Sequence, residues 1–339
     1  MANDLPLPKD APLAFWRAEI DRADIAQRAF HSAWDENVQW YAGRSPDAVA
    51  FSRTGDFVNV NVDFYQTEQK LAALFYDTPE LQLTGTGALT GAAPIIAAHK
   101  ALLSAILGDS HMDVLPVVHT AIKDCLAVSG TGPVILGYQP TVRFVTPPAV
   151  MGQMLDLRQP IPVPIHERYY ADRFSPKKLL IPADFHSTDW DKAPWLDMRF
   201  RMPLAMARRE FRLPATFTGT TVRDEHVLDA AQRAEEAATQ PYVDGHVIWY
   251  SAAFFDEGDV HPEQYRELVL IDTLEAPARH RDSPHQTIGP QGRMTAHSLI
   301  GNPIHPLTIR TMPDSAYVPS DSQMTRPLVR ELCKFRTQM

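Results

Sequence analysis

The chain has 339 residues, of which 45% are hydrophobic and 22% charged, a composition typical of a folded globular protein with room for roughly two domains. Its 32 Lys and Arg against 41 Asp and Glu give a net charge of −9, which argues against a protein that coats nucleic acid. Two cysteines, Cys125 and Cys333, are too few for a disulfide framework and point to a reducing compartment. No apolar run approaches the ~18 residues of a membrane span and the start lacks a signal peptide, so we expect a soluble protein without membrane contact.

Proline is unevenly distributed, and the predicted elements follow that distribution. Residues 1–132 hold 7 of the 29 prolines and residues 133–327 hold 22, so long helices are expected mainly in the first part. There, apolar residues recur at three- and four-residue steps, the period of an amphipathic helix. The pattern predicts helices at residues 13–41, 64–75, 94–107 and 112–128, with a short strand at 80–84 and a flexible loop at 85–91.

Beyond residue 132, short apolar runs between prolines predict strands. These runs cover residues 134–138, 141–145, 178–181, 196–202, 246–255, 267–273 and 307–312. The runs 246–255 and 265–273 are expected to pair as an antiparallel hairpin, and helices are expected at 204–211 and 221–239. Residues 275–305 have many Pro, His and Gly and no periodicity, so they are expected to form a long loop.

A last helix is predicted from residue 320 onward. Ser320, Asp321 and Ser322 are favourable N-cap residues. The apolar pattern behind them consists of Pro327, Leu328, Leu332 and Phe335. Because this pattern reaches Met339 without a Gly cap or a breaker, we expect the sequence to be the front part of a longer protein.

Two glycine-containing loops are candidates for a nucleotide site, at residues 84–91 and 129–132. Neither contains the Lys of a Walker A loop, and the spacing of the glycines in the first differs from the dinucleotide fingerprint. We interpret both as flexible turns. No GxSxG nucleophile motif surrounds Ser129, so a catalytic serine is not predicted there.

Histidine and aspartate provide the alternative of a metal-dependent enzyme. The triplets at 280–282 and 111–113 match the H-x-D part of a non-haem iron site, which a distant His could complete. With 13 histidines in the chain such matches arise easily by chance, and no HExxH or paired CxxC motif is present. Asp189 and Asp191 could act in acid–base chemistry but are typical of solvated loop carboxylates. No catalytic, cofactor-binding or metal-binding residue is therefore assigned.

Three stretches together resemble the portal proteins of tailed bacteriophages, the head-to-tail connectors. The first comprises FHSAW (30–34), WYAG (40–43), NVNVD (59–63) and KLAALFYDTP (70–79). The second comprises IKDCL (122–126), GTG (130–132), VILGY (134–138), KLLIPAD (178–184) and APWL (193–196). The third is YVPSD (317–321) leading into residues 326–339, similar to the arm before the long stem helix of that family.

The resemblance implies an α+β fold: a portal-like wing domain with a helical N-terminal part, a β-rich middle and the start of a stem helix. The corresponding divisions are residues 1–132, 133–319 and 320–339. It implies a structural subunit that assembles into a ring, expected to be a dodecamer. A protein of this kind is not an enzyme and needs no cofactor. The ring would sit in the virion at one vertex of the capsid, after assembly in the host cytoplasm.

The resemblance also implies the partners of the ring. These are a terminase, the major capsid protein, a head–tail adaptor or tail proteins, and double-stranded DNA that passes through the channel without sequence recognition during packaging and ejection. The net charge of −9 agrees with a channel that should hold few phosphates.

Side chains expected to matter for assembly fall into three sets. Trp16, Trp34 and Trp40 are expected in the core or between subunits. Arg199, Arg201, Arg208, Arg209 and Arg212 could meet DNA or a neighbouring subunit, with a solvated surface as the commoner interpretation. Arg326, Arg330, Lys334 and Arg336 on the last helix are the preferred candidates for ring or channel contacts.

Overall fold

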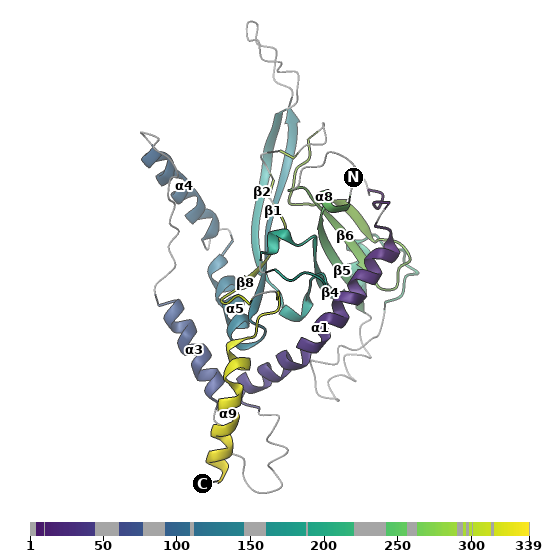
Figure 1. The fold of residues 1–339 in the computed structure, drawn as a ribbon. Helices are drawn as coiled ribbons and strands as arrows, with labels where there is room; N and C mark the ends of the chain where they lie inside the picture. Colours follow the sequence, from purple (N-terminus) through teal and green to yellow (C-terminus); the bar gives the residue numbers. More distant parts are fainter. Residues whose placement is uncertain are drawn as a thin grey trace.

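The fold was obtained as a computed structural model. It describes residues 5–9, 11–44, 61–76, 92–108, 112–145, 161–187, 189–219, 242–255, 263–289, 294–295, 298–299, 301–312 and 315–338. The strand predicted at 80–84, the loop at 85–91 and the helix at 221–239 lie outside these residues. Within them the chain is a mixture of helices and antiparallel sheets, as an α+β protein requires (Figure 1).

The helices predicted for the first part of the chain are confirmed. They are α1 (Leu13–Tyr41), α3 (Val62–Leu74), α4 (Ala92–Leu107) and α5 (Val114–Ala127). α1 ends where Gly43 adopts a left-handed φ of 72° and its N–H bonds the Trp40 carbonyl, a common glycine stop. Asn61 caps the start of α3, because its side chain accepts a hydrogen bond from the backbone N–H of Phe64 at 3.2 Å.

The described strands form two antiparallel sheets. One has the order β2-β1-β8, and the other the order β3-β4-β5-β6-β7. Their bounds are β1 Thr131–Val145, β2 Ile161–Arg173, β3 Leu179–Leu180, β4 Trp195–Pro203, β5 Tyr242–Ser251, β6 Tyr265–Ile271, β7 Arg279–Asp282 and β8 Ile304–Thr308. The predicted hairpin is confirmed, since β5 pairs with β6 over seven positions from Gly245↔Ile271 to Ser251↔Tyr265.

The structure corrects the sequence prediction in the first sheet. Residues 134–138 and 141–145 belong to a single strand, β1, and do not form two. Its long partner β2 is not among the predicted strands, and its prolines Pro162 and Pro164 disfavour a strand in general. β2 is an edge strand, where a residue without an N–H is tolerated.

Three further predictions are wrong in part. The expected loop at 275–305 contains β7 and the start of β8. The strand expected to reach residue 255 ends at Ser251, and a short helix α8 (Ala252–Phe255) follows. The strand expected at 307–312 lies earlier, at Ile304–Thr308. The helices near 204 and 320 are confirmed as α6 (Leu204–Glu210) and α9 (Asp321–Gln338).

The long helix α1 connects the five-stranded sheet with the other helices. Its first half buries Trp16, Ile20 and Ala23 against Trp195 and Tyr250 of the sheet. In its last turns, Trp40 packs against Val329 and Cys333 of α9. Trp34 is buried as well, so all three tryptophans named as core candidates lie inside the protein.

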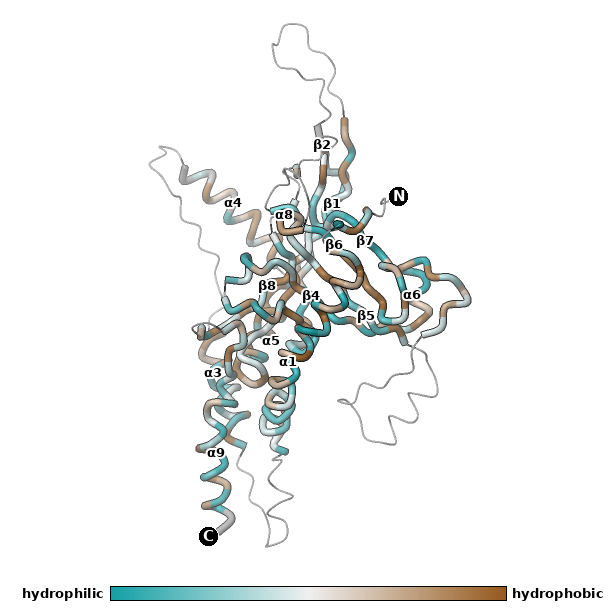
Figure 2. The backbone as a smooth tube through the Cα atoms, turned by 45° about the vertical axis from the view of Figure 1, so that its right-hand side comes forward, coloured by the Kyte–Doolittle hydropathy of each residue, from teal (hydrophilic) through white to brown (hydrophobic). Residues whose placement is uncertain are grey.

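Three elements extend from the body (Figure 1). β1 and β2 rise as a two-stranded ribbon, α9 projects in the opposite direction, and α4 stands away at one side. The view in Figure 2 shows the same separation of α4 from the ribbon. Among the helices that the structure describes, none is both long enough and apolar enough to cross a bilayer.

Candidate functional site

The first candidate region is the junction that holds α9. Ser320 caps the helix as predicted, because its Oγ accepts a hydrogen bond from the Gln323 N–H at 3.1 Å. Asn37 of α1 is fully buried and donates from Nδ2 to Ser320 Oγ at 3.0 Å and to the Val128 carbonyl at 2.6 Å. One buried amide therefore ties α1, the end of α5 and the start of α9 together.

Two of the four predicted contact residues lie in this junction. Arg326 Nη1 bonds Glu36 Oε2 of α1 at 2.6 Å, and Arg330 Nη2 bonds Glu36 Oε1 at 2.5 Å. Lys334 Nζ donates to Glu331 Oε1 of its own helix at 2.8 Å, and Arg336 is exposed. The two arginines thus fix α9 within its own chain, whereas Lys334 and Arg336 face the surroundings.

An acidic side chain from α3 holds the same helix from another side. Asp63 is buried and accepts hydrogen bonds from Ser322 Oγ at 3.0 Å and from Thr325 Oγ1 at 3.2 Å. Burial raises the pKa of Asp63, and the two hydroxyls and Arg326 offset only part of this effect. α9 is therefore anchored by polar contacts to both α1 and α3.

The opposite face of α9 is largely uncovered by the residues that the structure describes, and Arg310 Nη1, 2.6 Å from Met324 Sδ, contacts its first turn. Met324, Leu328, Leu332 and Phe335 are 55%, 74%, 38% and 60% exposed. They follow one another at steps of four, four and three residues, which places them in one stripe along the helix. The apolar pattern that predicted this helix therefore faces outward, while the inward face is formed by Ser322, Arg326, Val329 and Cys333.

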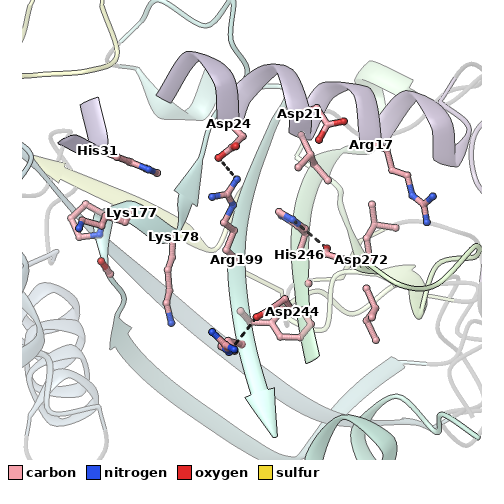
Figure 3. Close-up of a pocket in the computed structure, with 18 of the residues that line it drawn as sticks. Arg17, Asp21, Asp24, His31, Lys177, Lys178, Arg199, Asp244, His246 and Asp272 are labelled. Atoms are coloured by element: carbon pink, nitrogen blue, oxygen red, sulfur yellow. Dashed lines mark hydrogen bonds and ion pairs between the residues drawn. The ribbon is translucent and has the colours of Figure 1, made fainter. Parts of the chain in front are cut away.

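The second candidate region is a cleft of about 880 Å³ between α1 and strands β4 and β5 (Figure 3). Charged side chains line both walls. Asp24 of α1 bonds Arg199 of β4 and also Arg28 at 2.7 Å. Across the cleft, Arg201 Nε lies 3.6 Å from Asp244 Oδ1. Burial raises the pKa of Asp24, but the two arginines outweigh it and the net shift is downward.

A buried carboxylate lies behind this cleft. Asp197 of β4 is fully buried, and its Oδ2 lies 2.6 Å from His246 Nδ1 of β5. The other ring nitrogen, Nε2, lies 3.7 Å from Asp272 Oδ1. Burial lowers the pKa of His246, but the Asp197 carboxylate outweighs burial and the net shift is upward. His246 therefore holds its proton more tightly than an exposed histidine.

The charges in the cleft mainly join parts of the chain to one another. Asp24 joins α1 to the sheet, Lys177 bonds Asp35, and Arg17 donates to the Leu274 carbonyl. In the part of the chain that the structure describes, no group of three or more His, Cys, Asp or Glu could hold a metal ion. These ion pairs and hydrogen bonds therefore help to hold α1 against the sheet.

The residues of the metal-enzyme alternative are not brought together in the described part of the chain. His280 bonds the Tyr250 hydroxyl at 2.8 Å and the Leu5 carbonyl at 2.8 Å, and Asp282 faces Arg266. Asp113 lies next to the start of α5, and His111 is outside the described residues.

Arg208 is one of the arginines that could meet DNA or a neighbouring subunit. In the structure it donates to the Phe217 carbonyl at 2.5 Å, a contact within the chain.

The glycines of the second candidate loop have a packing role. A Cβ on Gly130 would lie 2.1 Å from the Val318 carbonyl oxygen, and one on Gly132 would lie 2.0 Å from that of Ala121. Gly130 also has a left-handed φ of 73°. This turn is closely packed, in contrast to the flexible turn expected from the sequence. The loop at 84–91 lies outside the described residues.

Comparison with known proteins adds no assignment. No protein-family model matches the sequence, and no curated protein matches it. The sequence singles out the arginines of α9 as contact residues. It does not single out Glu36 and Asp63, which anchor α9, or the buried Asp197–His246 pair. The partners of each are more than 45 residues away in the chain, so no local pattern signals them.

Proposed function

We propose that the protein is a ring-forming subunit of a bacteriophage portal, the channel at one capsid vertex. The observation that carries this proposal is the two-sided character of α9. One face is anchored in the chain through Arg326, Asp63 and Asn37, and the opposite face is an exposed apolar stripe. A helix held this firmly with an apolar side in water is typical of a contact between subunits.

The anchoring favours repeated assembly over non-specific association. Because the carboxylate of Glu36 accepts hydrogen bonds from two arginines of α9, the helix has a defined direction relative to α1. In the proposed ring, the stripe on one copy contacts a surface other than the stripe on the next copy. Because the stripe has a fixed direction, the angle between neighbouring copies is the same at each contact. Contacts between unlike surfaces close into rings when the rotation between copies allows it.

In this proposal the ring guides double-stranded DNA and has no catalytic task of its own. A separate terminase would supply ATP hydrolysis, and the capsid and tail components would dock on the ring. The net charge of −9 supports a channel through which DNA passes, because few phosphate contacts would have to be broken. Lys334 and Arg336, which face outward on α9, would contact the neighbouring subunit or the channel.

A substitution on the stripe tests this proposal. Leu328→Asp should reduce the assembled fraction, measured by size-exclusion chromatography with light scattering, and leave the circular dichroism spectrum unchanged. Ile25→Asp is the matched control, because Ile25 on α1 is 67% exposed but lies apart from the stripe. Assembly of Leu328→Asp at the level of the control, or a wild-type protein that stays monomeric at high concentration, would contradict the proposal.

A further inference from the structure

A small cavity lies where the middle of α1 meets the β-rich body and the segment before α9. Its volume is about 10 Å³, at the lower end of the roughly 10–15 Å³ that a single water molecule requires. Trp190 and Tyr317 in its lining are intermediate in exposure, and every other described residue that lines it is buried. The cavity therefore has room for one small molecule and little contact with the surface.

Three polar atoms of the lining have no hydrogen-bond partner among the described residues. They are Oε1 of Gln27 in α1, Nε1 of Trp190 in the short 3-10 helix η2 (Trp190–Lys192), and the hydroxyl oxygen of Tyr317. Each of these atoms is itself buried. Buried polar side-chain atoms in folded proteins nearly always bond either another protein group or an ordered water molecule.

The orientation of the Gln27 amide is fixed by the backbone. Its Nε2 donates to the Leu179 carbonyl at 2.6 Å, and only the nitrogen of the amide can donate to a carbonyl oxygen. Oε1 is therefore the atom left to accept a hydrogen bond. Because only 1% of the residue is exposed, Oε1 cannot turn outward to find a partner in bulk solvent.

Two aromatic side chains provide donors. The Tyr317 ring stacks on Phe30 of α1 with centroids 4.4 Å apart and planes at 17°, and the Trp190 ring packs against Phe185 at 5.7 Å. These contacts hold both rings in place. The indole N–H of Trp190 can only donate. Burial raises the pKa of Tyr317, so its hydroxyl keeps its proton at neutral pH and can donate as well.

We propose that one water molecule binds in this cavity and bridges Gln27, Trp190 and Tyr317. The water accepts hydrogen bonds from the Trp190 N–H and the Tyr317 hydroxyl and donates one to Gln27 Oε1. Three hydrogen bonds are typical of a buried water, whereas a cavity lined only by apolar groups stays dry. The bridge satisfies all three atoms, which form no direct hydrogen bond with one another.

The bridge joins parts of the chain that are distant in sequence. It connects the middle of α1 with the turn before β4 and with Tyr317, three residues before the Ser320 that caps α9. The water therefore helps to fix the segment from which α9 starts. The site lies within one subunit, so it does not depend on the proposed ring, and its failure would leave the ring proposal standing.

A crystal structure or electron-microscopy map that resolves ordered waters tests the site. We expect one water peak within about 3.2 Å of all three atoms in the wild-type protein. Tyr317→Phe removes one donor and keeps the ring, so it should weaken or abolish the peak. Tyr250→Phe is the matched control, because it removes the hydroxyl of a buried tyrosine that does not line the cavity, and it should leave the peak unchanged.

Three outcomes would overturn the water site. The first is a wild-type structure with no peak at this position. The second is density larger than a single water, which would mean that another molecule fills the cavity. The third is a peak of equal strength in the wild type and in Tyr317→Phe, which would show that the Tyr317 hydroxyl does not hold the water.

Discussion

Arg326 of α9 lies 2.6 Å from Glu36 of α1, and only 9% of its side chain is exposed. Arg330 bonds the second oxygen of the same carboxylate. The sequence presents both arginines as candidates for ring or channel contacts, and the structure places them at a junction inside the subunit. They therefore set the position of the surface on α9 that we propose to meet the next subunit.

Loss of Arg326 should loosen this junction. We expect Arg326→Met to lower the free energy of unfolding by about 1–3 kcal/mol, because Glu36 keeps Arg330 and is partly exposed, so the loss is smaller than for a fully buried pair. Lys334→Met is the control, since Lys334 and its partner Glu331 are 44% and 72% exposed and should contribute little. Chemical denaturation measures the free energy of unfolding of both variants. Equal values would show that Arg326 does not stabilise the junction between α1 and α9.

Gly130 and Gly301 form a matched pair for a test of backbone packing. Both have a left-handed φ, of 73° and 84°, where any residue with a Cβ costs about 1–2 kcal/mol. Only Gly130 also lies against another backbone, that of Val318, while nothing lies within 4 Å of a Cβ built on Gly301. Gly130→Ala should therefore lower the melting temperature clearly more than Gly301→Ala. Similar shifts for the two variants would show that the turn adapts.

His246 should make the stability depend on pH. Its pKa is raised in the folded protein, so its contribution to stability is complete below about pH 6.5 and is lost as the pH rises through the raised pKa. The charged groups around it are Asp197, Asp272 and Arg199. We expect His246→Gln to flatten the decrease in unfolding free energy from about pH 6.5 upward.

His305 provides the control for this titration. Burial lowers its pKa, so its contribution is lost as the pH falls, which is the opposite direction. His305→Gln should change the profile on the acid side and leave the alkaline side as in the wild type. If His246→Gln and the wild type have parallel profiles above pH 6.5, the Asp197–His246 pair does not titrate as described.

Local patterns predict the helices of this protein well. The bounds of α1 agree with the prediction at both ends, because its apolar residues recur regularly and Gly43 stops the helix. The start of α9 follows from Ser320, a good capping residue that does cap the helix. These features depend on neighbours within a few residues, which a single sequence displays directly.

The sequence does not show which residues that are far apart in the chain come together in the fold. β2 is not among the predicted strands. Its prolines Pro162 and Pro164 disfavour a strand in general, and only the sheet order shows that the strand lies at an edge. The pattern of Leu328, Leu332 and Phe335 predicts a helix but does not tell which side its neighbours cover. Asp197 and His246 meet because β4 and β5 pair in one particular register, with Arg199 opposite His246.

Electron microscopy of the purified protein tests the central claim most directly. The account predicts closed rings with a central hole, built from a constant number of copies, which become fewer when Leu328→Asp disrupts the stripe on α9. Dispersed single subunits at high concentration, with the fold intact by circular dichroism, would contradict the proposal that this chain is a ring-forming portal subunit.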